Sequence, residues 1–386
     1  MMRMVALVVL FGLTAMLSAC ARPPPLTAPS GVELTPLLTI SRVEARALLA
    51  LAGVKGMSVE HAVDCYRMTY SGPDAGLAPL SGLLALPRGA PARRVAAFLH
   101  GTATTRSAVP SKPDGTGLAA AILFAGNGYA MVAPDYPGMG ASPGRHPYYI
   151  AEAIAPAVTA MISAAQRIEG APDAPVFLSG FSEGGWATMA TLKQLESEGR
   201  PVIGAAPVAG AFDLMGLSVP AALKGGAPSH SLYLAYAAWG QAPYLGQRLD
   251  SALTPDMAAT VERLFAGAPP KEILETLPRD PRQMFAPAFL AAAGGHGTHW
   301  LAESFARNSV HTMTPRSPVR MYYGSRDIDV VPDESRRAAA AMRARGADVT
   351  AIDVGPLGHD ASMLAAAPRV LAWLRELEAA EVRPAP

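Results

Sequence analysis

The stretch VFLSGFSEGG, residues 176–185, decides how this chain should fold. Its first residues form an apolar run typical of a buried strand, and residues 184–196 have a helical pattern. Between them, residues 180–184 match the motif G-x-S-x-G, in which a sharp turn from strand to helix lifts a serine hydroxyl above a sheet. The two glycines leave room where side chains would clash. The segment therefore predicts a strand, a tight turn and a helix, with Ser182 displayed as a nucleophile.

The same alternation of short apolar runs and helical patterns continues on both sides of this stretch. Apolar runs occur at 95–99, 129–133, 176–178, 202–208, 319–323 and 349–354, and helical patterns at 118–125, 150–168, 184–196, 334–345 and 362–377. Strands that are apolar throughout and alternate with helices predict a mostly parallel central sheet flanked by helices on both faces. Upstream, a short helix at 41–51 and an antiparallel pair at 62–70 and 80–86 are expected.

One interval lacks strand patterns. Between the runs 202–208 and 319–323 the chain holds helical pieces broken by Pro and Gly, at 232–239, 257–265, 271–277, 287–293 and 301–307. We expect a helical lid at 214–318, inserted into a core that consists of 41–213 and 319–386. A second independent domain is the alternative, although no linker-like composition flanks the interval.

Candidate active-site residues follow the apolar runs, because ligands bind at the carboxyl ends of strands in open α/β sheets. A serine hydroxyl needs a histidine to accept its proton and an acid to orient that histidine. His359 follows the last run and precedes the last helix, which makes it the candidate base. The acid is expected after 319–323, where Asp327 and Asp329 are both candidates. The other histidines downstream of Ser182 are expected to be polar lid residues, namely His230, His296, His299 and His311. His296 and His299 lie close in sequence, but no nearby carboxylate or cysteine completes a metal site.

Taken together, these features resemble the α/β-hydrolase superfamily over residues 63–377. The superfamily's chain order of serine, acid and histidine implies a triad of Ser182, Asp327 and His359, with the acid at the position that matches its pattern G-x-x-D-x-x-V. Within the superfamily, the lid, the APDY segment at 133–136 and the HGT turn at 100–102 are similar to the secretory lipase group.

The resemblance also implies an oxyanion hole. Its donors would be the backbone amide of Thr102, or of Ala103, together with the amide of Glu183 at the start of the helix after the serine. Gly101 would let the backbone approach the substrate, and Tyr136 is expected to line the pocket. The turn at the serine carries Phe181 and Glu183 where the secretory lipase group more commonly has His and Gln.

The expected activity is hydrolysis of a carboxylic ester through an acyl-enzyme on Ser182, without a metal or other cofactor. Apolar and aromatic lid residues suit a small-molecule or lipid ester. The alternatives are a peptidase of the same fold, which would need a lid carboxylate to hold a substrate amine, and a non-catalytic surface lipoprotein on this scaffold. The formal net charge of +1, from 32 basic and 31 acidic residues, gives no indication of a nucleic-acid partner.

The N-terminus is expected to be a targeting segment. Residues 1–19 have the layout of a signal peptide, and the sequence LSAC that ends at Cys20 resembles a bacterial lipobox, with an ordinary signal peptide as the alternative. The resemblance to lipoproteins implies that a lipid on Cys20 anchors the protein in the bacterial cell envelope, and that it is retained at the outer membrane, since Ala21 and not Asp follows the cysteine. Residues 20–40 are expected to be a Pro-rich tether, and Cys65 a small buried residue.

Overall fold

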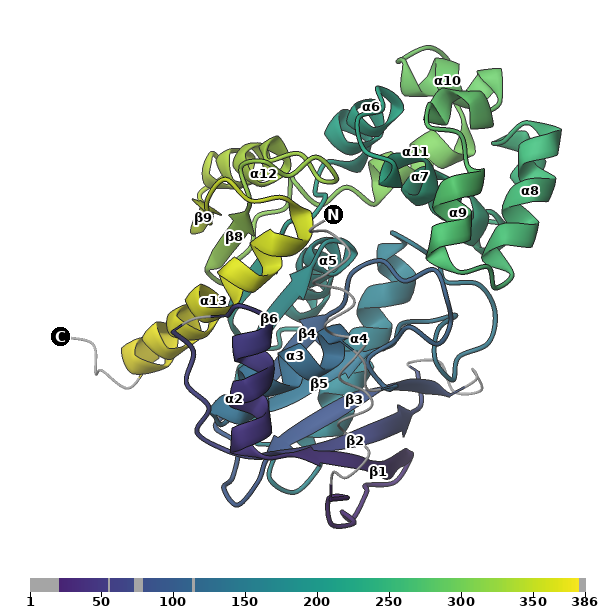
Figure 1. Ribbon diagram of the computed structural model, residues 1–386. Helices are drawn as coiled ribbons and strands as arrows, with labels where there is room; N and C mark the ends of the chain where they lie inside the picture. The colour runs from purple at the N-terminus through teal and green to yellow at the C-terminus, as the bar shows by residue number, and fades with distance from the viewer. Residues whose placement is uncertain (1–20, 55, 73–78, 113–114, 382–386) are drawn as a thin grey trace.

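The computed structural model describes residues 21–54, 56–72, 79–112 and 115–381 of the chain. Within these residues, nine strands form one sheet in the order β1-β2-β3-β5-β4-β6-β7-β8-β9, which crosses the molecule in Figure 1. Pairing is antiparallel from β1 to β5 in this order and parallel in the remainder, so the predicted mostly parallel sheet with an antiparallel opening is confirmed. The strands are β1 Val32–Ile40, β2 Val63–Tyr70, β3 Leu80–Pro87, β4 Val95–Leu99, β5 Ala130–Pro134, β6 Val176–Phe181, β7 Val202–Val208, β8 Val319–Tyr323 and β9 Val349–Asp353.

The outer strand β1 corrects one expectation. Residues 32–40, expected as the end of a free tether, pair along β2 at the edge of the sheet. Pro36 is accommodated because an edge strand leaves one side of its backbone unpaired, and the register shifts directly after it. The preceding chain also packs onto the sheet, since the amide of Thr39 donates to the carbonyl of Ala21 at 2.8 Å. The prediction of a tether is therefore wrong here, because a high proline content does not exclude an edge strand.

The other N-terminal expectations have separate outcomes. The signal peptide at 1–19 and the lipidated Cys20 lie outside the described residues. Cys65 is fully buried in β2, as expected. No helix in the described part of the chain combines the length and apolarity that a membrane span requires.

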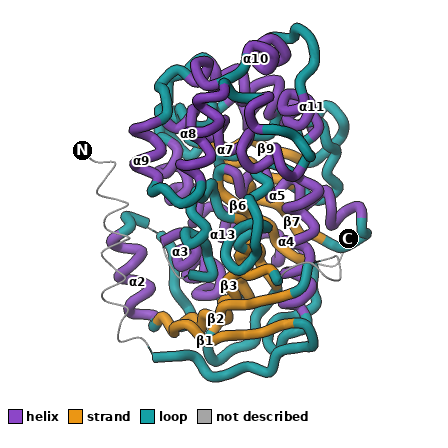
Figure 2. Tube along the Cα trace, turned by 90° about the vertical axis from the view of Figure 1, so that its right-hand side faces the viewer, coloured by secondary structure: helices purple, strands orange, loops and turns teal. Residues whose placement is uncertain are grey.

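Helices cover both faces of the sheet. Phe177 of β6 belongs to one buried cluster with α2, α3 and α13, while Leu178 belongs to a second cluster with α4, α5 and α12. In Figure 2, α2 and α3 accordingly lie on one side of the strands and α4 on the other. The helices of these two layers are α2 Arg42–Leu51, α3 Gly115–Phe124, η3 Ala125–Asn127, α4 Ala151–Gln166, α5 Glu183–Ser197, α12 Asp333–Arg343 and α13 His359–Glu381.

Between β7 and β8 the chain forms a group of helices that we call the cap helices. They lie together beyond one end of the sheet in Figure 1, and each helical piece predicted in this interval falls on one of them. One buried apolar cluster continues from Val132 of β5 to Phe289 in the cap helices, which favours a lid over an independent domain. The cap helices are η4 Leu214–Ser218, α6 Val219–Leu223, α7 Ser229–Tyr244, η5 Leu249–Ser251, α8 Pro255–Phe265, α9 Pro270–Thr276, η6 Pro281–Met284, α10 Pro287–Ala293 and α11 Trp300–Arg307.

Candidate active site

Ser182 forms the whole turn between β6 and α5. Its backbone has φ 59° and ψ −120°, a conformation that residues with side chains rarely adopt and that is concentrated at functional sites. Close packing on both sides imposes this turn. A Cβ atom at Gly180 would lie 2.2 Å from the carbonyl oxygen of Gly184, and one at Gly184 would lie 1.9 Å from that of Leu99. Both positions therefore require glycine, which is the physical basis of the G-x-S-x-G pattern here.

The structure brings Ser182, His359 and Asp327 together. The Oγ atom of Ser182 lies 2.8 Å from Nε2 of His359, and Nδ1 of the same ring lies 2.7 Å from Oδ2 of Asp327. All three side chains are buried, and the ring of Phe181 lies against the imidazole with 4.6 Å between the ring centroids. Because a carboxylate only accepts, the proton of a neutral imidazole lies on Nδ1, and Nε2 is free to accept the serine proton.

The loop after β8 distinguishes between the two candidate acids. The Oδ1 atom of Asp327 accepts hydrogen bonds from the amides of Asp329 at 2.9 Å and Val330 at 3.0 Å, which leaves Oδ2 aimed at the imidazole. The side chain of Asp329 instead accepts a hydrogen bond from the hydroxyl of Ser229 in α7. The geometry thus places Asp327, and not Asp329, in line with the histidine and the serine.

The electrostatic surroundings of His359 suit a proton acceptor. Burial alone lowers the pKa of the imidazole, because removing water disfavours its charged form. The hydrogen bond and charge of Asp327 act in the opposite direction, helped by the charges of Asp329 and Asp360, and the pKa of His359 is raised overall. A raised pKa makes the ring a stronger base towards the serine hydroxyl.

The two expected oxyanion donors lie at the ends of neighbouring elements. Glu183 begins α5, where the first amides of a helix have no partner in the helix, and Thr102 follows β4, the neighbour of β6. Among the described residues, neither of these two amides donates a hydrogen bond. Gly101 makes the approach possible, because a Cβ atom there would lie 3.3 Å from the Cβ of Ser182. The arrangement leaves both amides available to a ligand at the serine.

A cleft of about 430 Å³ opens over the serine. Its floor includes Gly101, Ser182 and His359 from the core. The cap helices form the opposite wall with apolar and aromatic side chains, namely Leu232, Tyr233, Pro270 and Leu274. The cleft thus brings the nucleophile and apolar side chains of the cap helices to the same space.

Tyr136 was expected to line the pocket, and this expectation is wrong. Its ring is 1% exposed and stacks on the ring of His100 at 4.3 Å, and its hydroxyl donates to the carbonyl of His100 at 3.1 Å. It is therefore a support behind the 100–103 loop. Its backbone, two residues after β5, has a φ of 73°, a conformation that residues with side chains rarely adopt.

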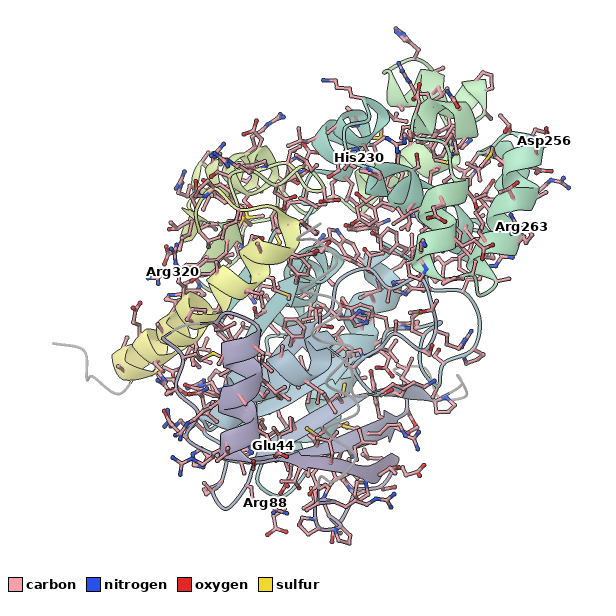
Figure 3. The ribbon with its side chains drawn as sticks, viewed as in Figure 1. Glu44, Arg88, His230, Asp256, Arg263 and Arg320 are labelled. Carbon is pink, nitrogen blue, oxygen red and sulfur yellow. The ribbon has the colours of Figure 1, made fainter. Side chains whose placement is uncertain are left out.

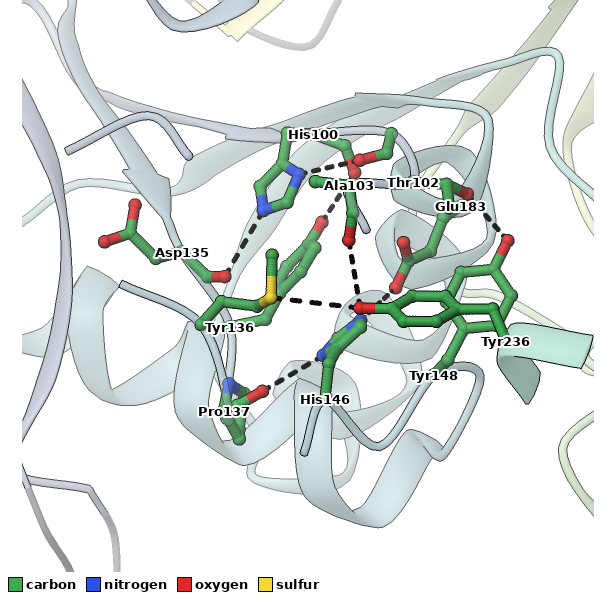
Figure 4. Close-up of polar contacts among 12 residues, drawn as sticks. His100, Thr102, Ala103, Asp135, Tyr136, Pro137, His146, Tyr148, Glu183 and Tyr236 are labelled. Atoms are coloured by element: carbon green, nitrogen blue, oxygen red, sulfur yellow. Dashed lines mark hydrogen bonds and ion pairs between the residues drawn. The ribbon is translucent and has the colours of Figure 1, made fainter. Parts of the chain in front are cut away.

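A buried pair next to the serine was not predicted from the sequence. Oε1 of Glu183 lies 2.6 Å from Nε2 of His146, and both side chains are almost completely buried (Figure 4). From the sequence, Glu183 is expected to supply a backbone amide and stands where the secretory lipase group more commonly has Gln, but no partner is predicted for its side chain and no role for His146. The available signal was the carboxylate next to the nucleophile, since a buried carboxylate requires a proton or a cation beside it.

The histidines of the cap helices have structural contacts. His299 caps α11, as Nδ1 accepts from the amide of Leu301 at 3.1 Å and Nε2 donates to the carbonyl of Ser251 at 3.0 Å. His230, which Figure 3 labels at the cap helices, has Nε2 3.0 Å from the carbonyl of Ile328. Across residues 21–381, leaving aside the undescribed gaps, no group of three His, Cys, Asp or Glu side chains could hold a metal ion.

Comparison with known proteins gives structural neighbours only. The sequence matches no protein-family model and no curated protein. A protein from Legionella pneumophila that is provisionally classed as a hydrolase superposes with a TM-score of 0.80 at 25% identity, over 92% of this chain and 99% of that one.

Two further neighbours have named activities. The rice cell wall degrading esterase LipA from Xanthomonas oryzae is 23% identical, with a TM-score of 0.76 over 94% of this chain and 100% of its own. Lipase A from Candida antarctica, in its closed state, is 14% identical, with a TM-score of 0.67 over 94% of this chain and 86% of its own. The chain has the α/β-hydrolase fold, a mostly parallel sheet flanked by helices with a helical insertion, and its structural neighbours are hydrolases.

Proposed function

We propose that this protein is a serine hydrolase that cleaves carboxylic esters through an acyl-enzyme on Ser182. The observation that carries the proposal is the continuous line of hydrogen bonds from Ser182 through His359 to Asp327 at the floor of a cleft. The neighbours that are an esterase and a lipase support the choice of ester hydrolysis among the reactions that this arrangement could perform.

The proposed reaction assigns one step to each of these side chains. Oγ of Ser182 attacks the ester carbonyl while Nε2 of His359 takes its proton, and Asp327 stabilises the resulting imidazolium. The negative charge on the former carbonyl oxygen is met by the amides of Thr102 and Glu183. When this tetrahedral intermediate collapses, the imidazolium gives its proton to the alcohol that leaves. Water then attacks the acyl-enzyme by the same route and releases the acid and the free serine.

The apolar wall of the cleft indicates the class of substrate. Leu232, Tyr233 and Leu274 line the same cleft as Ser182, so an acyl chain or an aromatic group bound there would contact them. Burying such a group contributes roughly 25 cal/mol for each Å² of apolar surface removed from water. We therefore propose small-molecule or lipid esters as substrates.

The peptidase alternative has weaker support. The cap carboxylates that could hold a substrate amine are paired with cations away from the cleft: Glu262 with Arg145, Glu272 with Arg263, and Glu275 with Lys271. Assays of aminoacyl amides beside esters separate the two activities.

The proposed activity is tested with a series of p-nitrophenyl esters of increasing acyl length and with a fluorophosphonate probe, on the wild type and on Ser182→Ala. We expect ester hydrolysis and probe labelling in the wild type and neither in the variant. A wild type that hydrolyses no ester and takes up no probe would favour a non-catalytic surface lipoprotein.

We also propose that Cys20 carries a lipid that anchors the protein in a bacterial envelope, on the basis of the LSAC sequence. Metabolic labelling with a fatty-acid analogue, followed by membrane fractionation, tests this. Cys20→Ala should abolish the label and release the protein from the membrane fraction, whereas a labelled Cys20→Ala protein would contradict the proposal.

A further inference from the structure

The pair formed by Glu183 and His146 lies directly behind the proposed oxyanion hole. The Glu183 side chain is 0% exposed and that of His146 is 2% exposed, and Oε1 and Nε2 are 2.6 Å apart. The other carboxylate oxygen, Oε2, has no hydrogen-bond partner among the described residues. The position of the Glu183 carboxylate therefore depends on the contact with His146.

The contacts of His146 define the proton content of the pair. Nδ1 lies 3.0 Å from the carbonyl oxygen of Pro137, which only accepts, so Nδ1 carries a proton. A contact of 2.6 Å between Nε2 and Oε1 then requires one further proton between the two atoms. The pair is thus neutral as a whole, whether that proton resides on the nitrogen or on the oxygen.

Neutrality matters at this position. The backbone amide of Glu183 is one of the two proposed oxyanion donors, and an isolated carboxylate on the same residue would oppose the negative charge that develops there. A negative charge at the N-terminus of a helix is normally stabilising. The Glu183 carboxylate, however, is buried beside an imidazole and does not face solvent.

The pair also connects to the loop that holds the second donor. The ring of Tyr136 lies between those of His146 and His100, with centroids 5.5 Å and 4.3 Å away (Figure 4). The hydroxyl of Tyr136 donates to the carbonyl of His100. One aromatic stack therefore joins the support of Glu183 to the start of the 100–103 loop.

The cap helix α7 packs closely against His146 and the 100–103 loop. A Cβ atom at Gly240 would lie 2.2 Å from the carbonyl oxygen of His146, and the hydroxyl of Tyr236 donates to the carbonyl of Ala103 at 2.9 Å. His146 is thereby held between α7 and the core.

We propose that His146 and the side chain of Glu183 are positioning residues for the oxyanion hole. Their neutral, hydrogen-bonded pair fixes the direction of the Glu183 amide and keeps an uncompensated negative charge away from the intermediate. This inference rests on the proposed ester hydrolysis at Ser182. It adds that the reaction requires a side chain of the length of Glu, held in a neutral pair, at the position after the serine.

Two conservative variants of Glu183 separate the effect of side-chain length from the effect of side-chain charge. Glu183→Gln keeps the length and can donate its amide proton to Nε2 of His146, while it carries no charge. Glu183→Asp keeps the charge but is shorter by one carbon–carbon bond, about 1.5 Å, so that it cannot keep the contact with Nε2. Glu196→Gln is the matched control, because this carboxylate lies at the far end of α5 and accepts from the amides of Arg316 and Ser317.

The measurements are kcat and KM for a short p-nitrophenyl ester and the inhibition constant of an aryl boronic acid, which forms a tetrahedral adduct with the serine. We expect the kcat of Glu183→Gln to stay within about threefold of the wild-type value. The kcat of Glu183→Asp should fall ~10- to 100-fold, which is less than the ~10²- to 10³-fold effect of deleting one oxyanion donor. The inhibition constant of the boronic acid should rise by a similar factor in Glu183→Asp, while KM changes little. Glu196→Gln should leave kcat unchanged.

The reverse order, with Glu183→Asp more active than Glu183→Gln, would overturn the positioning role and favour a charge effect on the helix. Equal activity of both variants and the wild type would also overturn it. Thermal unfolding of each variant confirms that a loss of kcat occurs in folded protein. If Ser182→Ala retained full activity, the proposed function itself would fail, so the two failures are distinguishable.

Discussion

The hydroxyl of Ser229, the first residue of α7, donates a hydrogen bond to the carboxylate of Asp329, two residues beyond Asp327. The neighbouring His230 contacts the carbonyl of Ile328 in the same loop, with 3.0 Å between nitrogen and oxygen. The start of α7 is therefore attached to the loop that positions Asp327. Substitutions at the start of this cap helix should therefore alter the position of Asp327 through these two contacts.

Ser229→Ala should lower kcat by ~2- to 10-fold, which corresponds to the loss of about one hydrogen bond that steadies the acid loop. The measurement is kcat for a short ester together with the midpoint of thermal unfolding. Ser231→Ala is the control, since this hydroxyl donates to the carbonyl of Pro278 within the cap helices and should alter stability without altering kcat. Equal effects of both variants on kcat would contradict the connection.

The choice between the two candidate acids gives a second prediction. Asp327→Asn should lower kcat by ~10³- to 10⁴-fold, because an amide favours the wrong tautomer of His359 and does not stabilise its charged form. Asp329→Asn should cost less than about tenfold, because this side chain contacts Ser229 and not the imidazole. Steady-state kinetics of both variants decide the matter, and a larger loss in Asp329→Asn would reverse the assignment.

The pH dependence of activity should show the raised pKa of His359. The ring must be neutral to accept the serine proton, so kcat/KM should fall as the pH drops through its pKa, with a midpoint above 6.5. Asp360→Asn removes one of the charges that raise this pKa and should move the midpoint to lower pH.

The control for the pH profile is Asp333→Asn, an exposed carboxylate in the first turn of α12 that is not among the groups that raise this pKa. Its midpoint should equal that of the wild type. A midpoint at or below 6.5 in the wild type would show that burial outweighs the carboxylates around the imidazole.

Tyr233 should limit the length of the acyl chain. It lines the cleft over Ser182 and also a second cavity of about 60 Å³ deeper under the cap helices, whose other walls include Leu214, Leu234 and Phe305. Tyr233→Ala joins the two spaces, so the preferred p-nitrophenyl ester should shift to a longer chain. Tyr244→Ala, at the end of the same helix, should leave the preference unchanged, and a parallel shift in both variants would contradict the assignment.

Most strands and helices of the core could be predicted from the sequence, because each depends on a local pattern. The meeting of three distant side chains was implied by the resemblance to α/β-hydrolases. Short apolar runs identify strands buried on both faces, and Gly180 and Gly184 mark a turn that no other residue fits. The residues of the loop alone left both Asp327 and Asp329 as candidate acids, and the resemblance to α/β-hydrolases indicated Asp327. The structure adds that Asp329 contacts Ser229 from a distant helix, which no local pattern shows.

The carboxylate next to the nucleophile pointed to a buried partner for Glu183, but the identity of that partner, His146, could not be predicted because it comes from a distant loop. Nothing in the loop from Asp135 to Ile150 reveals that one imidazole will face a carboxylate 37 positions later in the chain. Composition was equally uninformative at the N-terminus, where proline suggested a loose segment although residues 32–40 form an edge strand.

The packing of the first described residues determines how far a lipid anchor could hold the body of the protein from a bilayer. Ala21 is hydrogen-bonded to Thr39, and the hydroxyl of Tyr66 donates to the carbonyl of Pro24 at 2.9 Å, so the chain adheres to the sheet directly after Cys20. If Cys20 carries the proposed lipid, the residue that follows it is already held at the β1 edge of the sheet, and the body of the protein would lie close to the bilayer. Its reach would then be limited to esters that diffuse to that surface or lie within it.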